Sequence, residues 1–189
     1  MSRYWLNSPD KKQNPEEFNK RVVEVCDIYA NAINLHEENI HVISTDEMTG
    51  IQALERINPT KPVAPNQVEK IEFEYKRNGT VSLMGNFEVA TGKVIAPYLN
   101  ATRNEDDFVQ NIKNILNIYP SDEVIFISDQ LNTHKSESLV KLVAQSCEIN
   151  EYLGIKGKEG ILKSIESRAE FLSNPKHKQD SWLQVEFLL

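Results

Sequence analysis

Two short apolar runs, each followed by an aspartate, stand out in the hydrophobic pattern of the chain. The first spans residues 40–43 and leads into a polar segment that contains Asp46, and the second spans residues 124–128 and leads directly into Asp129. Such runs are typical of strands that are buried on both faces. Because open α/β sheets bind ligands beyond the carboxyl ends of such strands, Asp46 and Asp129 are candidates for a functional site.

Helical and alternating patterns surround the two runs. Apolar residues recur every three to four positions over 15–35, which predicts a packing helix. Apolar and polar residues alternate over 81–89, which predicts a strand with one buried face. A break at Thr91 and Gly92 makes residues 93–99 its hairpin partner. These elements predict an α/β fold, a mixed sheet flanked by helices.

The region between the two aspartates supplies the connections. Three prolines in residues 58–65 predict an extended loop, which we expect to cross toward the site. The spacing of Thr102 and Glu105 predicts a capping box at the start of a helix that leads to the strand before Asp129. A further helix is predicted to begin near Ser136. The order strand, helix, strand favours a right-handed parallel connection.

Two aspartates at one sheet edge would form a site for hard divalent cations. Such ions prefer oxygen ligands, and phosphoryl chemistry often uses a pair of them about 4 Å apart. A single aspartate after a strand is more often a helix cap or a turn former than a ligand. The pattern alone therefore leaves both interpretations open, and the surrounding sequence has to decide between them.

The sequence around both aspartates resembles the catalytic domain of bacterial insertion-sequence transposases of the DDE superfamily, which are relatives of the mariner group. The stretches that carry the resemblance are residues 41–56, 68–80 and 127–136. It extends from about Arg3 to Lys178 and resumes at residues 181–183. The resemblance implies an RNase H-like fold, with residues 1–39 as an N-terminal helical lead-in and residues 40–189 as the catalytic domain.

The resemblance also implies a site, a cofactor and partners. Matched position by position, the family's three metal-binding carboxylates are Asp46, Asp129 and Glu186, the last in a late helix, and they would hold two Mg²⁺ or Mn²⁺ ions. His134 would contact a phosphate or position water, although Gln130 stands where the family pattern has Asn. The implied function is metal-dependent cleavage of DNA at transposon ends and strand transfer, by a homo-oligomer and without a covalent protein intermediate.

The carboxyl-terminal part departs from the family pattern. Residues 179–180 replace a longer family segment, and Trp182 and Glu186 are four residues apart where the family has five, which rotates the acid by one helical step. Three residues follow Glu186, too few for a helix to form without strong packing. Two alternatives stay open: an inactive remnant that acts only as an oligomerisation or inhibitory partner, and an RNase H-like nuclease of another lineage.

Composition adds limits of its own. A chain of 189 residues that is 40% hydrophobic can bury one good core, so one domain is expected. The net charge of −7 is unusual for a nucleic-acid binder, so DNA binding is expected to depend on the helix-turn-helix region that the family carries upstream. The absence of a signal-like segment and of a long apolar span predicts a cytoplasmic protein without membrane contact, as does the absence of a cysteine cluster.

Overall fold

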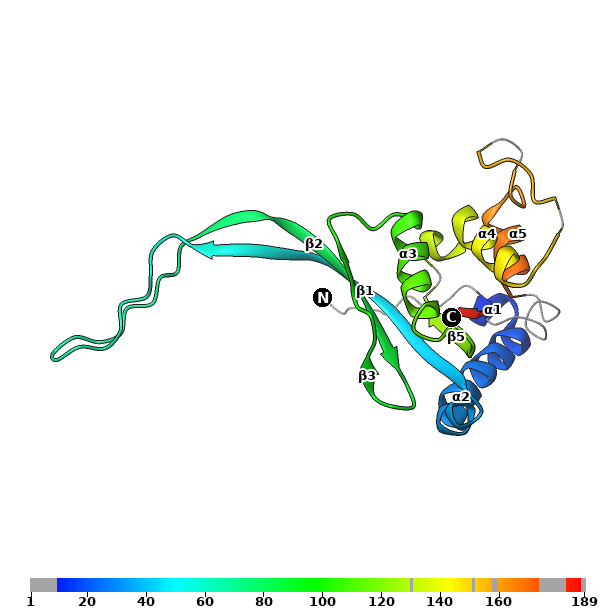
Figure 1. Cartoon of the computed structure of the whole chain (residues 1–189), viewed down its shortest axis with the longest axis horizontal. Helices are drawn as coiled ribbons and strands as arrows, with labels where there is room; N and C mark the ends of the chain where they lie inside the picture. Colours follow the sequence, from blue (N-terminus) through cyan, green and yellow to red (C-terminus); the bar gives the residue numbers. More distant parts are fainter. Residues whose placement is uncertain (1–9, 130, 151, 158–159, 174–182, 188–189) are drawn as a thin grey trace.

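One mixed β-sheet organises the chain (Figure 1). The computed structural model describes residues 10–129, 131–150, 152–157, 160–173 and 183–187, the last range by its backbone alone. The elements in chain order are α1 (Asp10–Gln13), α2 (Pro15–Glu37), β1 (Ile40–Arg56), β2 (Tyr75–Glu88), β3 (Lys93–Val94), β4 (Tyr98–Asn100), α3 (Glu105–Leu116), β5 (Glu123–Ser128), the 3-10 helix η1 (Asn132–Lys135), α4 (Glu137–Ser146), α5 (Ile165–Leu172) and β6 (Leu183–Phe187).

The strand order in the sheet is β3-β2-β1-β5-β6, and β4 also pairs with β2. β2 is antiparallel to β1, β3 and β4, whereas β5 is parallel to both β1 and β6. A parallel connection needs a long crossover, and α3 supplies it between the antiparallel part of the sheet and β5. The structure confirms the α/β class and the mixed sheet flanked by helices.

Side chains alternate between the two faces of a strand, and both faces of the central strands are covered. On one face, Val42, Ile125 and Ile127 pack against Ala32 of α2. On the other face, Ile43 and Phe126 belong to a larger cluster that α3, α4 and α5 complete. The predicted packing helix over 15–35 is therefore confirmed as α2, and β1 and β5 form the centre of a three-layer arrangement.

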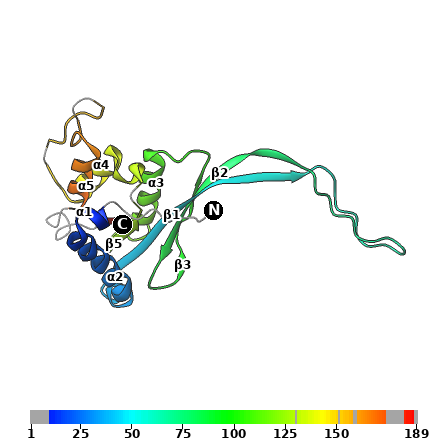
Figure 2. The same ribbon diagram turned by 180° about the vertical axis from the view of Figure 1, so that it is seen from behind.

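β1 and β2 continue far beyond this covered region as a projecting two-stranded arm (Figures 1 and 2). The predicted loop over 58–65 belongs to its tip, where two isolated bridges, Lys61 with Lys70 and Ala64 with Gln67, hold the chain against its returning half. The expectation that this loop crosses toward the site is wrong. β1 keeps its antiparallel partner as far as Arg56, so the loop is carried away from the sheet.

The strand predicted over 81–89 is present as part of β2, but its buried face is the opposite of the one that its apolar residues suggest. Ser82, Met84, Asn86 and Glu88 are buried, whereas Phe87 is 44% exposed and Val81 36% exposed. Polar side chains occupy this face because β1 and α3 provide hydrogen-bond partners for them, among which are His41 and Asn111.

Two helix starts refine the predictions. The cap of α3 is Asn104, which forms a capping box with Asp107, so the predicted box of Thr102 and Glu105 is wrong by two residues. Thr102 instead donates a hydrogen bond to Asp107, 2.7 Å away. α4 begins behind its cap Ser136, as predicted. No helix in the described part of the chain has the length and apolar character needed to cross a membrane.

Candidate metal-binding site at the sheet edge

Asp46 lies within β1, whereas the pattern had predicted that it follows the end of the strand. The strand continues because β2 pairs with it on both sides of this residue, in the register Asp46↔Gly85. The parallel partner β5, by contrast, leaves β1 after the pair Ser44↔Ile127. The Asp46 carboxylate is exposed and accepts a hydrogen bond from the backbone N–H of Glu47 through Oδ1, at 2.8 Å. Its second oxygen takes no part in that bond.

Asp129 follows β5 directly and is also exposed. If the register Ser44↔Ile127 is extended by two residues, Asp129 comes level with Asp46 on the neighbouring strand. β5 itself ends at Ser128, so this comparison places the backbones of the two residues at the same end of the sheet. The two aspartates of the sequence prediction thus lie at one edge, where the parallel pairing ends.

His134 connects this edge to the next residue of β1, Glu47. Its Nε2 lies 2.9 Å from Glu47 Oε1, and its Nδ1 lies 2.7 Å from Asp129 Oδ1 and 2.7 Å from Ser128 Oγ. An imidazolium that donates from both nitrogens fits these acidic neighbours. The side chain of His134 is only 1% exposed, whereas that of Asp129 is 56% exposed. His134 therefore orients Asp129 from behind and leaves the carboxylate open to solvent.

The protonation of His134 follows from these surroundings. Burial alone would lower its pKa, but the hydrogen bond and charge of Glu47, together with the neighbouring Asp129, raise the pKa above its ordinary value. The Phe108 ring of α3 stacks on the imidazole, with centroids 4.0 Å apart. The ring is thus fixed on one side by packing and at both nitrogens by acceptors. Glu47 and Ser128 were missed by sequence reasoning, since nothing local marks them as partners of a histidine.

A buried amide pair holds β1 and β2 in place beside Asp46. Asn86 and Asn111 are fully buried, and each donates to the other's side-chain oxygen, at 2.8 and 2.9 Å. Thr45 donates to Asn86 Oδ1 at 2.6 Å and so joins the strand residue before Asp46 to this pair. Buried groups that satisfy one another in this way define a single arrangement of the strands. The backbone at Asp46 is accordingly well fixed.

Gly85 is the register partner of Asp46, and its lack of a side chain leaves Asp46 uncovered on the β2 side. Directly paired side chains on antiparallel strands lie about 5 Å apart, so any larger residue at position 85 would stand next to the carboxylate. The ladder between β1 and β2 is regular at Gly85, and its register shifts lie farther along, after Met48.

Glu186 lies in a strand, β6, and not in the late helix that the resemblance implied. It pairs with Ile127 of β5, which is two residues before Asp129. The backbone of Glu186 thus lies on the strand next to the one that leads into Asp129. The physical reason is that β5 offers an unpaired edge, whose backbone groups a short segment can bond at once, whereas a short helix must first pay for nucleation. Trp182 and Gln130, which entered the sequence predictions, lie outside the described residues.

Within the described part of the chain, a group of three possible metal ligands within 4.8 Å of one another is found elsewhere, at the start of β1. It consists of His36, His41 and Glu88. The edge around Asp46 and Asp129 thus offers two exposed carboxylates, backed by a buried ion pair. Exposed oxygen donors of this kind suit hard cations such as Mg²⁺, which keep several waters when bound.

Comparison with known proteins fits this arrangement. The sequence model of the DDE superfamily endonucleases matches residues 41–180, well over half of the chain, and the chain therefore belongs to this family. The mixed sheet flanked by helices agrees with the fold class that the sequence predicted. A comparison with curated proteins gives no match.

Two solved structures are similar to the chain. One is a crystal structure of the Mos1 mariner paired-end complex with Mn, which has 16% identity over 77% of this chain and 44% of that chain, with a TM-score of 0.44. The other is the Mos1 transposase paired-end complex with the left transposon end, with 15% identity, coverage of 77% and 43%, and a TM-score of 0.41. The chain thus spans less than half the length of these proteins.

Proposed function

We propose that this chain is the catalytic domain of a DNA transposase that cleaves phosphodiester bonds at transposon ends and transfers the strands to target DNA. The observation that carries the proposal is the position of Asp46 and Asp129 at one sheet edge, within a chain that belongs to the DDE superfamily endonucleases. The division into a helical lead-in, residues 1–39, and a catalytic domain, residues 40–189, is part of the same proposal.

Asp46 and Asp129 would hold the metal through the oxygens that face solvent. In both residues a hydrogen bond or ion pair engages Oδ1, and Oδ2 takes no part in these contacts. Two bound Mg²⁺ or Mn²⁺ ions would activate an attacking oxygen and neutralise the leaving one. His134 would keep the Asp129 carboxylate oriented while its own charge is balanced by Glu47. We infer that His134 acts on the substrate through Asp129, because its side chain is buried.

The third carboxylate of the family corresponds to Glu186. Its backbone position on β6 lies beside β5, close in the sheet to Asp129. We propose it as the third ligand on the strength of the sequence match and of this neighbouring strand.

The placement of Glu186 in a strand also favours a second candidate function. A chain that lacks a correctly placed third ligand would keep its fold and lose catalysis. It would then be an inactive remnant that acts only by oligomerisation with, or inhibition of, an active transposase. The similar solved structures are paired-end complexes of a transposase. For this chain, DNA and a second copy are part of the proposal in either case.

Nicking of supercoiled plasmid DNA, with Mg²⁺ or Mn²⁺, tests the first function. Asp46→Asn keeps the size of the side chain and removes its charge, so we expect it to lower the nicking rate about 100-fold or more. The matched control is Asp27→Asn, which makes the same change at an exposed position of α2. Nicking by Asp46→Asn at the unmutated rate would remove this residue from the mechanism.

The second function is tested in the same assay by mixing. If the unmutated chain does not nick DNA but lowers the activity of a full-length transposase in proportion to its concentration, it is the inhibitory remnant. Calorimetric titration with Mn²⁺ separates the two further. An active domain should show binding that is lost in Asp46→Asn, whereas a remnant should show little binding in either protein.

A further inference from the structure

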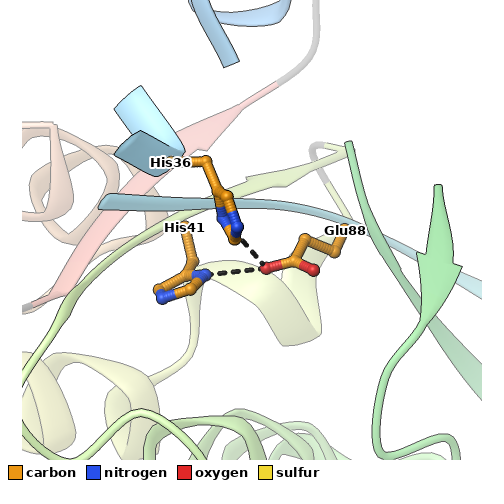
Figure 3. Close-up of side chains that lie close together, drawn as sticks. All are labelled: His36, His41 and Glu88. Carbon is orange, nitrogen blue, oxygen red and sulfur yellow. Dashed lines mark hydrogen bonds and ion pairs between the residues drawn. The ribbon is translucent and has the colours of Figure 1, made fainter. Parts of the chain in front are cut away.

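A second polar cluster lies at the start of β1 and has no part in the function proposed above. It consists of His36 from the last turn of α2, His41 from β1 and Glu88 from the end of β2. Figure 3 shows the three side chains pointing toward one another. His41 and Glu88 are buried, and His36 is partly exposed. Two consecutive elements, α2 and β1, thus contribute one possible metal ligand each, and β2 adds a third from 47 residues farther along the chain.

The distances suit a small cation. The ligand atoms of the three residues all lie within 4.8 Å of one another. Glu88 Oε1 is 3.6 Å from His36 Nδ1 and 2.7 Å from His41 Nδ1. Bonds of 2.0–2.1 Å in a tetrahedral arrangement require ligand atoms about 3.3 Å apart. The pair with His36 already has nearly this spacing, and the pair with His41 needs to open by about 0.6 Å, a small side-chain rotation.

His36 Nδ1 supplies an independent indication. This nitrogen is buried and has no hydrogen-bond partner in the part of the chain that the structure describes. Its nearest acceptor, Glu88 Oε1, is too far away for a hydrogen bond. Buried polar atoms are nearly always satisfied, so an orphan nitrogen directed at a carboxylate and a second imidazole calls for a missing partner. A metal ion at this point would satisfy it.

The surroundings orient the other two ligands as metal sites commonly do. His41 directs Nδ1 at Glu88 and its second nitrogen, Nε2, at Asp122 Oδ2, 3.2 Å away. A carboxylate behind a coordinating histidine fixes its tautomer and raises its basicity. Tyr119 stacks on the His41 ring with centroids 3.7 Å apart and donates a hydrogen bond to Glu88 Oε1, while Thr91 donates to Glu88 Oε2.

We propose that His36, His41 and Glu88 bind a divalent transition-metal ion, for which Zn²⁺ is the best match. Two imidazoles and one carboxylate are borderline ligands that favour Zn²⁺ over the hard Mg²⁺. The partly exposed His36 leaves an approach from solvent and room for water as a fourth ligand. Because the ligands come from α2, β1 and β2, the ion would fasten the lead-in helix to the sheet, and it would do so away from the catalytic edge.

Titration of the metal-free whole chain with Zn²⁺ alone tests the site. We expect binding of one ion at this cluster and a rise of the melting temperature with Zn²⁺ concentration, since a ligand that binds the folded state stabilises it. His36→Gln should weaken this binding about 100-fold or more, and Asp122→Asn about 10–100-fold. Asp27→Asn is the control, because it removes an exposed carboxylate of α2 that belongs to neither cluster and should leave the Zn²⁺-dependent rise unchanged.

Co²⁺ in place of Zn²⁺ gives a readout that does not depend on any variant folding correctly. The unmutated chain should develop the intense visible bands of four-coordinate Co²⁺, and addition of Zn²⁺ should remove them. The proposal is overturned if these bands do not appear. It is also overturned if Zn²⁺ binds equally well to His36→Gln, or if the rise in melting temperature disappears in Asp46→Asn and persists in His36→Gln.

Discussion

The two ends of the covered part of β1 carry polar clusters of opposite character. At one end, the Asp129 side chain is 56% exposed and is held from behind by the nearly inaccessible His134. At the other end, Glu88 and His41 have side chains that are only 3% and 8% exposed and are bonded mainly to each other and to neighbouring residues. The first cluster presents carboxylates to solvent, and the second encloses its carboxylate within the fold.

This difference separates two uses of the same residue types. A carboxylate that must meet a metal and a phosphate has to keep oxygens free of protein contacts, which limits its contribution to stability. A buried carboxylate must have all its contacts, and its removal leaves partners unsatisfied. The proposed catalytic edge should therefore respond to substitution mainly in activity, and the His41 end mainly in stability.

The largest effect on stability is expected from Glu88→Ala. This change leaves His41, Tyr119 and Thr91 without their common acceptor, and each buried donor left unsatisfied typically costs about 1–3 kcal/mol. Urea unfolding in the presence of a chelator measures it. Glu16→Ala, at an exposed position of α2, is the control and should change the free energy of unfolding by less than about 0.5 kcal/mol. A loss below about 1 kcal/mol for Glu88→Ala would break the contrast between the two ends.

His134→Ala tests the buried support of the exposed edge. It leaves Glu47 without its cationic partner and opens a space beside Phe108, so we expect a loss of about 2–4 kcal/mol in the free energy of unfolding. Unlike Glu88→Ala, it should also lower DNA nicking, because Asp129 loses its orientation. A variant that unfolds at the same urea concentration as the unmutated chain would show that His134 is not part of this support.

Asp107 is a carboxylate that belongs to neither cluster, and its lowered pKa makes its contribution to stability depend on pH. Burial alone would raise the pKa of Asp107, but hydrogen bonds from Thr102, the Asn104 backbone and Asn100 lower it below its ordinary value of 3.8. The charged form is thus favoured in the folded state, so its contribution to stability is present above the unfolded-state pKa and is lost as the pH falls through the lower folded-state pKa.

We accordingly expect Asp107→Asn to cost about 1 kcal/mol at neutral pH, through the weakened cap of α3. The difference from the unmutated chain should shrink as the pH falls below 3.8. Unfolding by urea at several pH values measures both effects. A difference that grows on acidification would contradict the lowered pKa.

The smallest effect on stability is expected from Asp46→Asn. The side chain is exposed, and the hydrogen bond that its Oδ1 accepts from Glu47 can be kept by the amide oxygen. The free energy of unfolding should change by less than about 0.5 kcal/mol, while nicking is lost. If this variant were destabilised as strongly as Glu88→Ala, the distinction between an exposed catalytic edge and a buried structural cluster would not hold.

The sequence revealed those features that are encoded locally. The apolar runs before Asp46 and Asp129 predicted the two central strands, and periodicity predicted α2 and the helix behind Ser136. The end of β1 was misplaced because its antiparallel partner, residues 75–88, has to be known before the strand can be extended. Glu186 was placed in a helix by resemblance, although its final position depends on the open edge of β5.

The contacts that were missed are long-range and polar. His134 and Glu47 are 87 residues apart, and His41 and Glu88 are 47 residues apart. The alternation in β2 indicated that its apolar residues are the buried set. Asn86 and Glu88 are buried instead, because they form hydrogen bonds with Asn111 and His41. A hydrophobicity pattern cannot reveal a buried polar face, since it carries no information about the partner that compensates for desolvation.

The spacing of His41 and Asp46 along β1 has an evolutionary consequence. Their separation is an odd number of positions on a strand whose pairing with β2 stays regular up to Met48, so the two residues belong to opposite faces. Deletion or insertion of a single amino acid between them would exchange the faces of everything downstream. Descendants of this sequence should therefore tolerate substitutions in this stretch far more readily than any change in its length.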